Sequence, residues 1–414
     1  MAERPRLYFC FPYHGVGGVS LLFLRVGEAL ARAGLADVTL VDYADGYMAR
    51  HRDPGLTRLA EYADDGALAI PGDAIAIFQS MTPWSIFPGL RPDPATRLLF
   101  WNCHPFNLVP TLPGIRTRMQ RSPALAKLLL ATLLRGFAGR MRRFVRTLLA
   151  GDSLVFMDEP NLVTTRDLLG IAVPEPRFLP IPAPEVEPRG QRAPSRRLHV
   201  AWVGRIVDFK YHILEHALRA LDEAQPALAR PVLVTVIGSG EYLPQLREAA
   251  AGLRNIEIRF VDELSPDALD HFLRAEVDLL LAMGTAALEG AKLAIPTLLL
   301  DIAYGPVAPD YRFTWLHERQ GYALGDMANR PGAPREPGSM GRRLAELAAD
   351  PDGVGQAALQ HFRRFHALSV VAAGLISHVV SARCCWGDLQ AAGLTDRGLA
   401  YSLFTGLRKR FGRK

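Results

Sequence analysis

Short apolar runs alternate with amphipathic stretches in the first part of the chain. An apolar run at 6–11 leads through a glycine-rich segment into residues 20–33, where apolar side chains recur at helical spacing, and a second apolar run follows at 38–41. This pattern predicts a strand, a helix and a parallel strand, the usual opening of a doubly wound sheet. Further runs predict strands at 74–78, 97–101 and 153–157.

The same alternation restarts after a segment rich in proline and charge at 180–197. It predicts strands at 199–203, 232–237, 255–261, 277–282 and 297–300. Between them it predicts helices at 213–221, 265–274 and 284–293. Because 414 residues exceed one ordinary domain, we expect an α/β protein of two Rossmann-like domains, 1–185 and 198–375. The remaining segment, 376–414, is expected to be helical, could cross back to the first domain, and ends in a basic tail.

Composition describes a globular chain with an uneven distribution of charge. Hydrophobic residues make up 49% and charged residues 22%, which excludes the disordered class. The net charge is +6, yet the stretch between Asp93 and Asp152 holds ten basic residues and no acidic one, and Arg408–Lys414 holds five more. These stretches contribute +10 and +5, which leaves −9 for the rest, so the basicity marks local surfaces for a partner.

Several observations place the protein in the cytoplasm. The four cysteines lack zinc-ligand spacing, the N-terminus does not resemble a signal peptide, and no apolar run reaches the ~20 residues of a membrane span. Residues 124–150 form a basic helical pattern whose apolar members are Leu130, Leu134, Phe137, Met141, Phe144 and Leu148. We predict that the basic segment 116–146 and the tail 408–414 bind the anionic inner face of the plasma membrane. The alternative is a helix packed on the domain core with a solvated basic face. Nucleic acid is disfavoured, because few aromatic residues and no recognition motif accompany the charge.

Candidate chemistry begins after the apolar run at 199–203. Gly204 provides a turn, and Arg205 and Lys210 then lie five residues apart where a strand gives way to a helix. Open α/β sheets bind ligands at this end of a strand, and two cations there suit a diphosphate. The alternative is two solvated cations at the start of a helix.

A second candidate site follows the first predicted strand. Gly15, Gly17 and Gly18 would let the backbone approach a ligand at a helix N-terminus. The segment also half-matches the dinucleotide-binding fingerprint, with Ser20 where the third glycine belongs and Asp42 at the end of the next strand. A nicotinamide-dependent oxidoreductase or epimerase therefore remains an alternative.

Two further turns in the second half carry candidate ligand-binding residues. Gly238 and Gly240 permit a tight strand-to-helix turn that either meets phosphate or is a plain turn. Gly284 and Thr285 open a predicted helix, and Glu289 lies one turn into it. A carboxylate repels phosphate but accepts two hydrogen bonds from a diol such as ribose. The alternative is a first-turn glutamate favoured by the helix dipole. In the first half, His104 follows a predicted strand and is either structural or catalytic.

Together these motifs resemble the retaining GT-B glycosyltransferases of the family-4 type, also called group 1. The matching stretches are HGVGGVS, GRIVDFK, VIGSG and LLLAMGTAALEGAKLAIPTLLLD, in that order along nearly the whole chain. The resemblance implies two Rossmann-like domains facing each other across a cleft. It implies catalytic roles for Arg205, Lys210 and His104. It also implies a donor-binding set of Gly17, Gly18, Gly204, Gly238, Gly240, Gly284, Thr285 and Glu289.

One position departs from the family pattern. The first glutamate of the E-x7-E motif would fall at position 281, where this chain has Leu281. In the family that glutamate contacts the donor sugar, so its absence leaves the sugar undetermined. Thr285 is a candidate for a substitute contact.

The resemblance implies transfer of a sugar from a UDP- or GDP-sugar to a lipid-linked or saccharide acceptor in bacterial surface polysaccharide or glycolipid synthesis. We expect retention of configuration and no cofactor. The only Asp-x-Asp, Asp350–Asp352, lies in a polar turn, so no metal site is assigned. A catalytically inactive GT-B binding protein remains a further alternative, because of Leu281.

Overall fold

The computed structural model describes residues 4–15, 17–79, 87–111, 115–190, 195–319, 321–328 and 338–395. The chain divides into two compact units. Unit 1 comprises Met1–Ile181 and Leu368–Lys414, and unit 2 comprises Pro182–Ala367. Within these described ranges, every helix is too short or too polar to cross a membrane.

Unit 1 is built on a parallel sheet with the strand order β3-β2-β1-β5-β7-β8. Its strands are β1 (Arg6–Cys10), β2 (Asp37–Asp42), β3 (Arg58–Glu61), β5 (Ala74–Gln79), β7 (Arg97–Asn102) and β8 (Leu154–Phe156). The inner strands are nearly continuous apolar runs, as expected for a parallel sheet covered on both faces. A separate two-stranded ribbon pairs β4 (Leu68–Ile70) with β6 (Leu90–Pro92).

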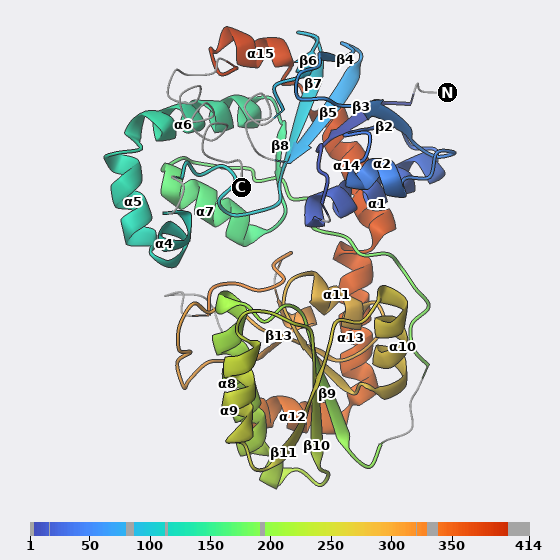
Figure 1. Ribbon diagram of the computed structural model, residues 1–414, viewed down its shortest axis with the longest axis vertical. Coiled ribbons are helices and arrows are strands. Elements are labelled where there is room, and N and C mark those ends of the chain that lie inside the picture. Colours follow the sequence, from blue (N-terminus) through green and yellow to red (C-terminus); the bar gives the residue numbers. More distant parts are fainter. Residues whose placement is uncertain are drawn as a thin grey trace. The chain divides into compact units, whose positions relative to one another are not determined.

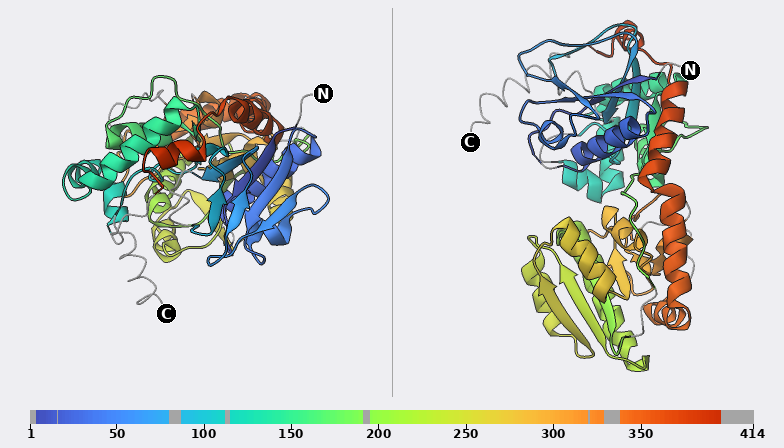
Figure 2. Two further views of the ribbon diagram at one scale, coloured as in Figure 1. Left: turned by 90° about the horizontal axis from the view of Figure 1, so that it is seen from above. Right: turned by 90° about the vertical axis from the view of Figure 1, so that its right-hand side faces the viewer.

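The helices of unit 1 include one that returns from the far end of the chain. α14 (Leu368–Ser381) packs against α1 (Gly18–Arg32), and the apolar residues Val371, Leu375 and Val379 enter the core that α1 helps to form (Figures 1 and 2). The other helices are α2 (Tyr47–His51), α4 (Arg116–Arg121), α5 (Pro123–Ala131), α6 (Arg135–Ala150), α7 (Glu159–Leu169) and α15 (Trp386–Ala391).

The two boundaries between the units differ from those predicted at 185 and 375. The backbone N–H of Ala183 donates to the carbonyl of His366 at 2.9 Å, and that of Arg189 donates to Leu293 at 3.1 Å, which tie residues 183–189 to unit 2. The stretch 368–375 belongs instead to unit 1, because Val371, Ala372 and Leu375 are buried in the core of that unit.

Unit 2 repeats the architecture, with the strand order β11-β10-β9-β12-β13-β14. All neighbours are parallel except β13 and β14. The strands are β9 (Leu198–Val203), β10 (Val232–Ile237), β11 (Ile256–Val261), β12 (Leu279–Ala282), β13 (Thr297–Leu299) and β14 (Thr314–Trp315). In Figure 1, α8 (Asp208–Ala224) and α9 (Leu243–Ala251) flank one face of this sheet, and α10 (Pro266–Glu276), α11 (Thr285–Ala291) and α13 (Pro351–Phe365) lie toward the other.

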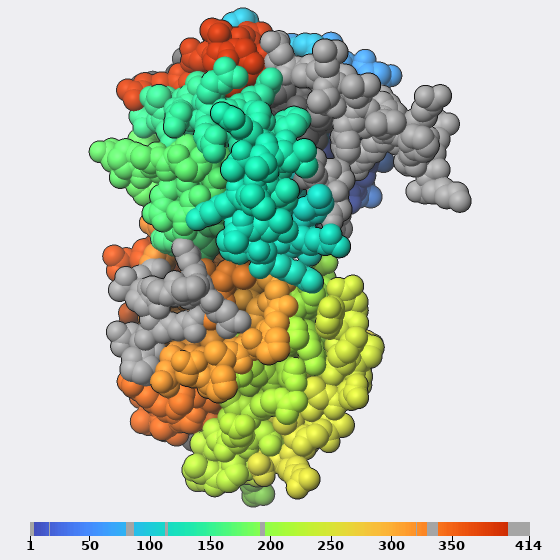
Figure 3. Space-filling model, turned by 90° about the vertical axis from the view of Figure 1, so that its left-hand side faces the viewer, coloured from blue at the N-terminus to red at the C-terminus, as the bar shows by residue number. Residues whose placement is uncertain are grey.

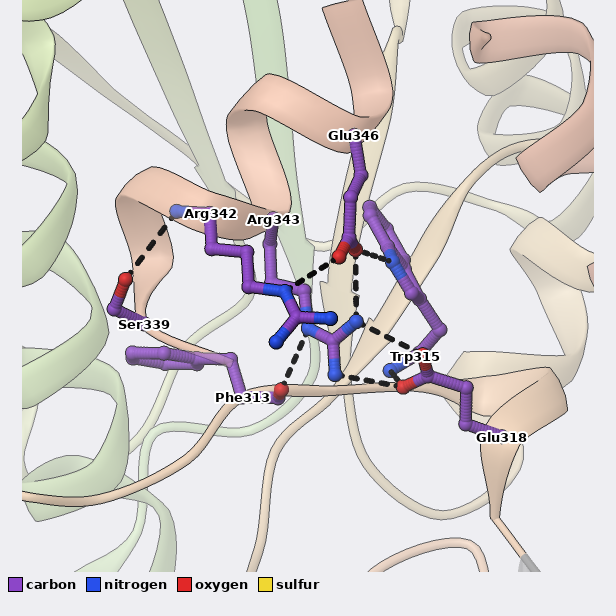
Figure 4. Close-up of polar contacts among 7 residues, drawn as sticks. All are labelled: Phe313, Trp315, Glu318, Ser339, Arg342, Arg343 and Glu346. Carbon is purple, nitrogen blue, oxygen red and sulfur yellow. Dashed lines mark hydrogen bonds and ion pairs between the residues drawn. The ribbon is translucent and has the colours of Figure 1, made fainter. Parts of the chain in front are cut away.

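A buried arginine fastens α12 (Met340–Ala349) to the segment around β14. Arg343 is 1% exposed, and its guanidinium donates to both oxygens of Glu318, to Glu346 and to the carbonyl of Phe313, at 2.8–2.9 Å (Figure 4). Glu346 also accepts from the Trp315 indole at 2.8 Å. Burial opposes the charged carboxylate, but these hydrogen bonds outweigh it and lower the pKa of Glu346 to about 2.

Each sheet has a point where the order of the strands reverses. In unit 2 the chain runs from β9 out to β10 and β11, then returns to β12 on the other side of β9. In unit 1 the corresponding neighbours are β1 and β5. Ligands of open α/β sheets bind outside the carboxyl ends of the strands at such a point. In unit 2 these ends lead directly into Gly204 and Gly284.

Candidate functional site

The loop from β9 to α8 places the two predicted cations at the reversal point of unit 2. Gly204 has φ +146°, a conformation that glycine adopts readily. The Lys210 ammonium lies 3.1 Å from the position that a Cβ at residue 204 would occupy, so it sits directly over this backbone. Its Nζ is also 5.8 Å from the ring centroid of Trp202 and 5.9 Å from that of Phe209. Lys210 is therefore half-buried against the end of the strand.

Neither cation is neutralised within the described part of the chain. No hydrogen bond or ion pair joins the side chain of Arg205 or of Lys210 to another described residue. Burial, and then the neighbouring Arg205 charge, lower the pKa of Lys210. A bound anion would relieve both effects. Two adjacent cations without a carboxylate partner thus form a site suited to an anion.

The glycine turn after β10 shapes this cationic loop. A Cβ at Gly238 would lie 2.3 Å from the Gly204 carbonyl oxygen, and one at Gly240 would lie 2.2 Å from that of Ile206. The two loops are hydrogen-bonded, with Ile206 N–H donating to Ser239 at 2.8 Å and Tyr242 N–H donating to Ile206 at 3.1 Å. The close approach that requires these glycines is therefore between the two loops.

The turn after β12 carries the second predicted group. Gly284 has φ +61°, and its N–H donates to the Leu324 carbonyl at 2.6 Å. Nothing described lies within 4 Å of the position that a Cβ at residue 284 would occupy, so the space above this glycine is open. Thr285 is exposed at the start of α11, and Glu289 is partly exposed one turn later. Since β12 is hydrogen-bonded to β9, this turn and the Arg205 loop follow neighbouring strands.

Glu289 has a partner that we did not predict from the sequence. The Lys292 ammonium lies 2.5 Å from Glu289 Oε2 and 3.0 Å from Asp270 Oδ1. Glu289 and Lys292 are three residues apart, a spacing that brings side chains together on a helix. The spacing could have predicted the contact between Lys292 and Glu289. It could not predict the contact with Asp270, because that residue comes from a different helix, α10.

Leu281 is a packing residue of unit 2. It lies inside β12, pairs in register with Trp202 and Leu298, and is fully buried in the core of the unit. The expectation that the missing glutamate affects the choice of donor sugar stays a prediction.

In unit 1, the glycines after β1 lie at the start of α1. Gly17 precedes the helix in extended conformation, and its carbonyl accepts a hydrogen bond from the Ser20 hydroxyl at 2.9 Å. A Cβ at Gly17 would lie 3.1 Å from the Tyr13 ring, whereas Gly18 has no described atom within 4 Å of that position. The helix N-terminus at Gly18 is therefore open on the side where a side chain would stand.

Asp42, the acidic residue on which the nicotinamide alternative rests, accepts hydrogen bonds from backbone N–H groups of unit 1. It is fully buried, Oδ1 accepts from the N–H groups of Tyr13 and Tyr43, and Oδ2 accepts from those of Met48 and Ala49, at 2.7–3.2 Å. Burial raises the pKa of this carboxyl, although the four hydrogen bonds favour its charged form. With both oxygens engaged, Asp42 fixes the loop after β1 and is not available to a ribose, which weighs against a nicotinamide cofactor.

His104 lies in the turn after β7 and is held in one tautomer. Its Nδ1 accepts a hydrogen bond from Phe106 N–H at 3.1 Å, so the neutral ring carries its proton on Nε2. Burial, followed by the charge of Arg116, lowers the pKa of His104 to about 4. At neutral pH this imidazole is therefore an uncharged hydrogen-bond donor.

The basic segment of unit 1 differs from the predicted membrane-facing stripe. Leu130, Leu134, Phe144 and Leu148 are buried in the unit and Met141 is partly buried, so most of the predicted stripe is core. Of the predicted stripe, Phe137 on α6 is exposed (51%). Two apolar residues outside the stripe are exposed as well: Leu128 on α5 (60%) and Leu133 between the two helices (66%). This part of unit 1 forms the teal surface in Figure 3. The predicted tail 408–414 lies outside the described residues.

No protein-family model matches the chain, and no curated protein matches it. Solved structures do. HepE of Anabaena, crystallised in complex with UDP, is 11% identical, with coverage of 92% of this chain and 100% of that chain and a TM-score of 0.54. A glycosyltransferase from Rickettsia africae is 12% identical, with coverage of 92% and 99% and a TM-score of 0.55. The lipopolysaccharide outer core galactosyltransferase WaaB is 10% identical, with coverage of 91% and 99% and a TM-score of 0.50. Both sheets have a reversal of strand order, and the likeness covers nearly the full length of each solved structure. These findings confirm the expected architecture: the chain has the GT-B fold, with two Rossmann-like domains.

Proposed function

We propose that this protein is a glycosyltransferase that moves a sugar from a nucleoside-diphosphate sugar to an acceptor hydroxyl. The observation that carries the proposal is the pair Arg205 and Lys210, two cations without an acidic partner among the described residues, at the strand reversal of unit 2. Proteins of the same fold support it: one bears the name glycosyltransferase, another galactosyltransferase, and a third was crystallised with UDP.

Departure of the nucleoside diphosphate sets the main chemical demand. Breaking the bond to the sugar leaves new negative charge on a phosphate oxygen, and protein cations can stabilise that charge without a metal. A unit charge pair at about 4 Å is worth roughly 4 kcal/mol at an effective dielectric near 20. Arg205 can bind two phosphate oxygens at once, and Lys210 supplies a point charge. In this proposal the reaction is metal-independent and retains configuration, and the donor is a UDP- or GDP-sugar.

The other donor contacts follow from the chemistry of each group. Glu289 would accept hydrogen bonds from the ribose hydroxyls, and the open backbone at Gly284, with Thr285 beside it, would approach the donor sugar. Gly204, Gly238 and Gly240 would shape the loop that holds the diphosphate. In unit 1, the Nε2–H of His104 would donate to a sugar oxygen, and the helix N-terminus at Gly17 and Gly18 would face the donor phosphates.

The acceptor and the location form the second part of the proposal. Exposed Leu128, Leu133 and Phe137 lie among exposed cations, including Lys127 and Arg135. Apolar residues interspersed with cations suit an anionic lipid surface. We therefore propose a peripheral protein at the inner face of the plasma membrane, with a lipid-linked acceptor for a surface polysaccharide or glycolipid.

The test is a panel of nucleotide sugars incubated with the purified full-length protein and lipid extract, with release of nucleoside diphosphate as the readout. We expect release from one UDP- or GDP-sugar and not from the other donors. Tight nucleotide binding without turnover of any donor would favour a catalytically inactive binding protein of the same fold. Binding of NAD in preference to UDP and GDP would contradict the proposal.

A further inference from the structure

Lys292 is the most deeply placed member of an ion-paired cluster at the candidate ribose site. Its side chain is 8% exposed, whereas those of Glu289 and Asp270 are each 25% exposed. The ammonium therefore contacts both carboxylates from the protein side, and part of each carboxylate still reaches solvent. The cation also lies at the C-terminal end of α11, where the helix dipole favours positive charge.

The ion pair holds Glu289 by its carboxylate while leaving part of the side chain exposed. Lys292 Nζ lies 2.5 Å from Glu289 Oε2, and the Glu289 side chain is 25% exposed. A free glutamate side chain has several rotatable bonds, and ordering it upon ligand binding costs up to about 2 kcal/mol. The ion pair with Lys292, at 2.5 Å, restricts the carboxylate before the ligand arrives.

We propose that Lys292 is a positioning residue that orients the Glu289 carboxylate toward the ribose of the donor nucleotide. This inference rests on the proposed function, because it assigns Glu289 to the ribose. Lys292 touches Glu289 and not the ligand, and its positive charge offsets the repulsion between this carboxylate and a nearby diphosphate. Asp270 holds the ammonium from the other side, so the cation stays in place when the nucleotide leaves.

The experiment measures how strongly the protein prefers a ribonucleotide. UDP and GDP are titrated into the full-length protein by calorimetry, each beside its 2′,3′-dideoxy analogue, which lacks the hydroxyls that Glu289 would bind. The variants are Glu289→Gln, Lys292→Met, Lys292→Arg and the double variant of Glu289→Gln with Lys292→Met. Arg219→Met, which removes an ion pair on the exposed face of α8, is the control, and thermal unfolding verifies that each variant folds.

We expect Lys292→Met to lower the preference for the ribonucleotide about fivefold, the size of one weakened hydrogen bond. Glu289→Gln should also lower the preference for the ribonucleotide, and the double variant should lose no more of it than Glu289→Gln alone. Lys292→Arg, which keeps the positive charge, should retain most of the preference. Arg219→Met should change nothing. A general structural role would weaken binding of the ribo and dideoxy forms equally.

Three results would overturn the inference, and they differ from one another. If wild type prefers the ribonucleotide and Lys292→Met keeps that preference, Lys292 does not position Glu289, and the proposed function stands. If neither UDP nor GDP binds to wild type, the proposed function fails and the inference fails with it. Should Lys292→Met not fold, the same preference measured in Lys292→Arg and Glu289→Gln decides: an unchanged preference in Glu289→Gln contradicts the inference.

Discussion

A histidine can be kept neutral by its surroundings, and His104 is one such residue. Burial and the Arg116 charge lower the pKa of His104 from 6.5 to about 4, and Phe106 N–H fixes the tautomer. The unfolded chain binds a proton at the ordinary pKa, so the fold loses stability as the pH falls from 6.5 toward 4. Above that window the neutral ring is a donor through Nε2, which is the form that contact with a sugar oxygen requires.

This state can be observed directly. In an NMR titration, the His104 ring resonance, assigned by its loss in His104→Asn, should stay at its neutral position down to about pH 5 and move only near 4. A midpoint for His104 between pH 6 and 7 would contradict a buried neutral imidazole.

Single residues could be predicted from the sequence where the signal was local. Arg205, Lys210 and Glu289 were predicted from their spacing after apolar runs. The structure places them after the neighbouring strands β9 and β12, and their roles in binding stay predictions. Asp42 was identified as well, but with the wrong role, because its four backbone donors come from three separate segments of unit 1. The Lys292 cluster could not be predicted in full, since Asp270 comes from a separate helix, α10, and meets Lys292 only in the folded unit.

At the scale of elements, one periodic pattern had two meanings. The apolar stripe at 130–148 fits a membrane surface and a protein core equally well, and in unit 1 most of it is core. Leu133 lies in the break between α5 and α6, outside the helical period, so its exposure could not be read from the sequence. Conversely, continuous apolar runs identified the central strands, whereas short β3, β4 and β6 gave too little signal.

The proposed membrane surface on and between α5 and α6 predicts the effect of substitutions on binding to lipid. Replacement of Leu128, Leu133 and Phe137 by serine should reduce flotation with anionic vesicles at least about tenfold, because each buried apolar side chain contributes about 1.5–3 kcal/mol. Leu35→Ser, at an exposed leucine elsewhere in unit 1, should float like wild type. High salt should also reduce flotation, since the cations are screened. Equal flotation of the two variants would contradict this surface.

The Arg343 cluster makes a second prediction at this scale. Arg343→Met leaves Glu318 and Glu346 without their shared cation, which should lower the free energy of unfolding by about 3–5 kcal/mol. Arg342→Met, one residue away and with a side chain 59% exposed, should change it by less than about 1 kcal/mol. Urea unfolding measures both variants. Similar losses in the two would show that the buried network of Figure 4 does not fasten α12.

At the scale of the whole molecule, the repeated alternation of strands and helices was enough to predict two Rossmann-like units. The exact boundaries between the units could not be predicted from this alternation. Residues 183–189 hydrogen-bond to unit 2 without forming a strand, and α14 has no strand beside it to mark its return to unit 1. Both features depend on contacts between distant parts of the chain. The reversal of strand order is likewise a property of the assembled sheet, although it decides where the Arg205 loop lies.

Binding of a diphosphate by Arg205 and Lys210 can be measured in a single pair of titrations. UDP and uridine, which share base and ribose and differ in the diphosphate, are titrated by calorimetry into wild type and into the variant with Arg205→Ala and Lys210→Ala. Charge-assisted hydrogen bonds of about 1.5–3 kcal/mol from each cation predict that wild type prefers UDP by at least about 100-fold and that the variant loses most of this preference. A double variant that folds and still binds UDP as tightly as wild type would contradict the account.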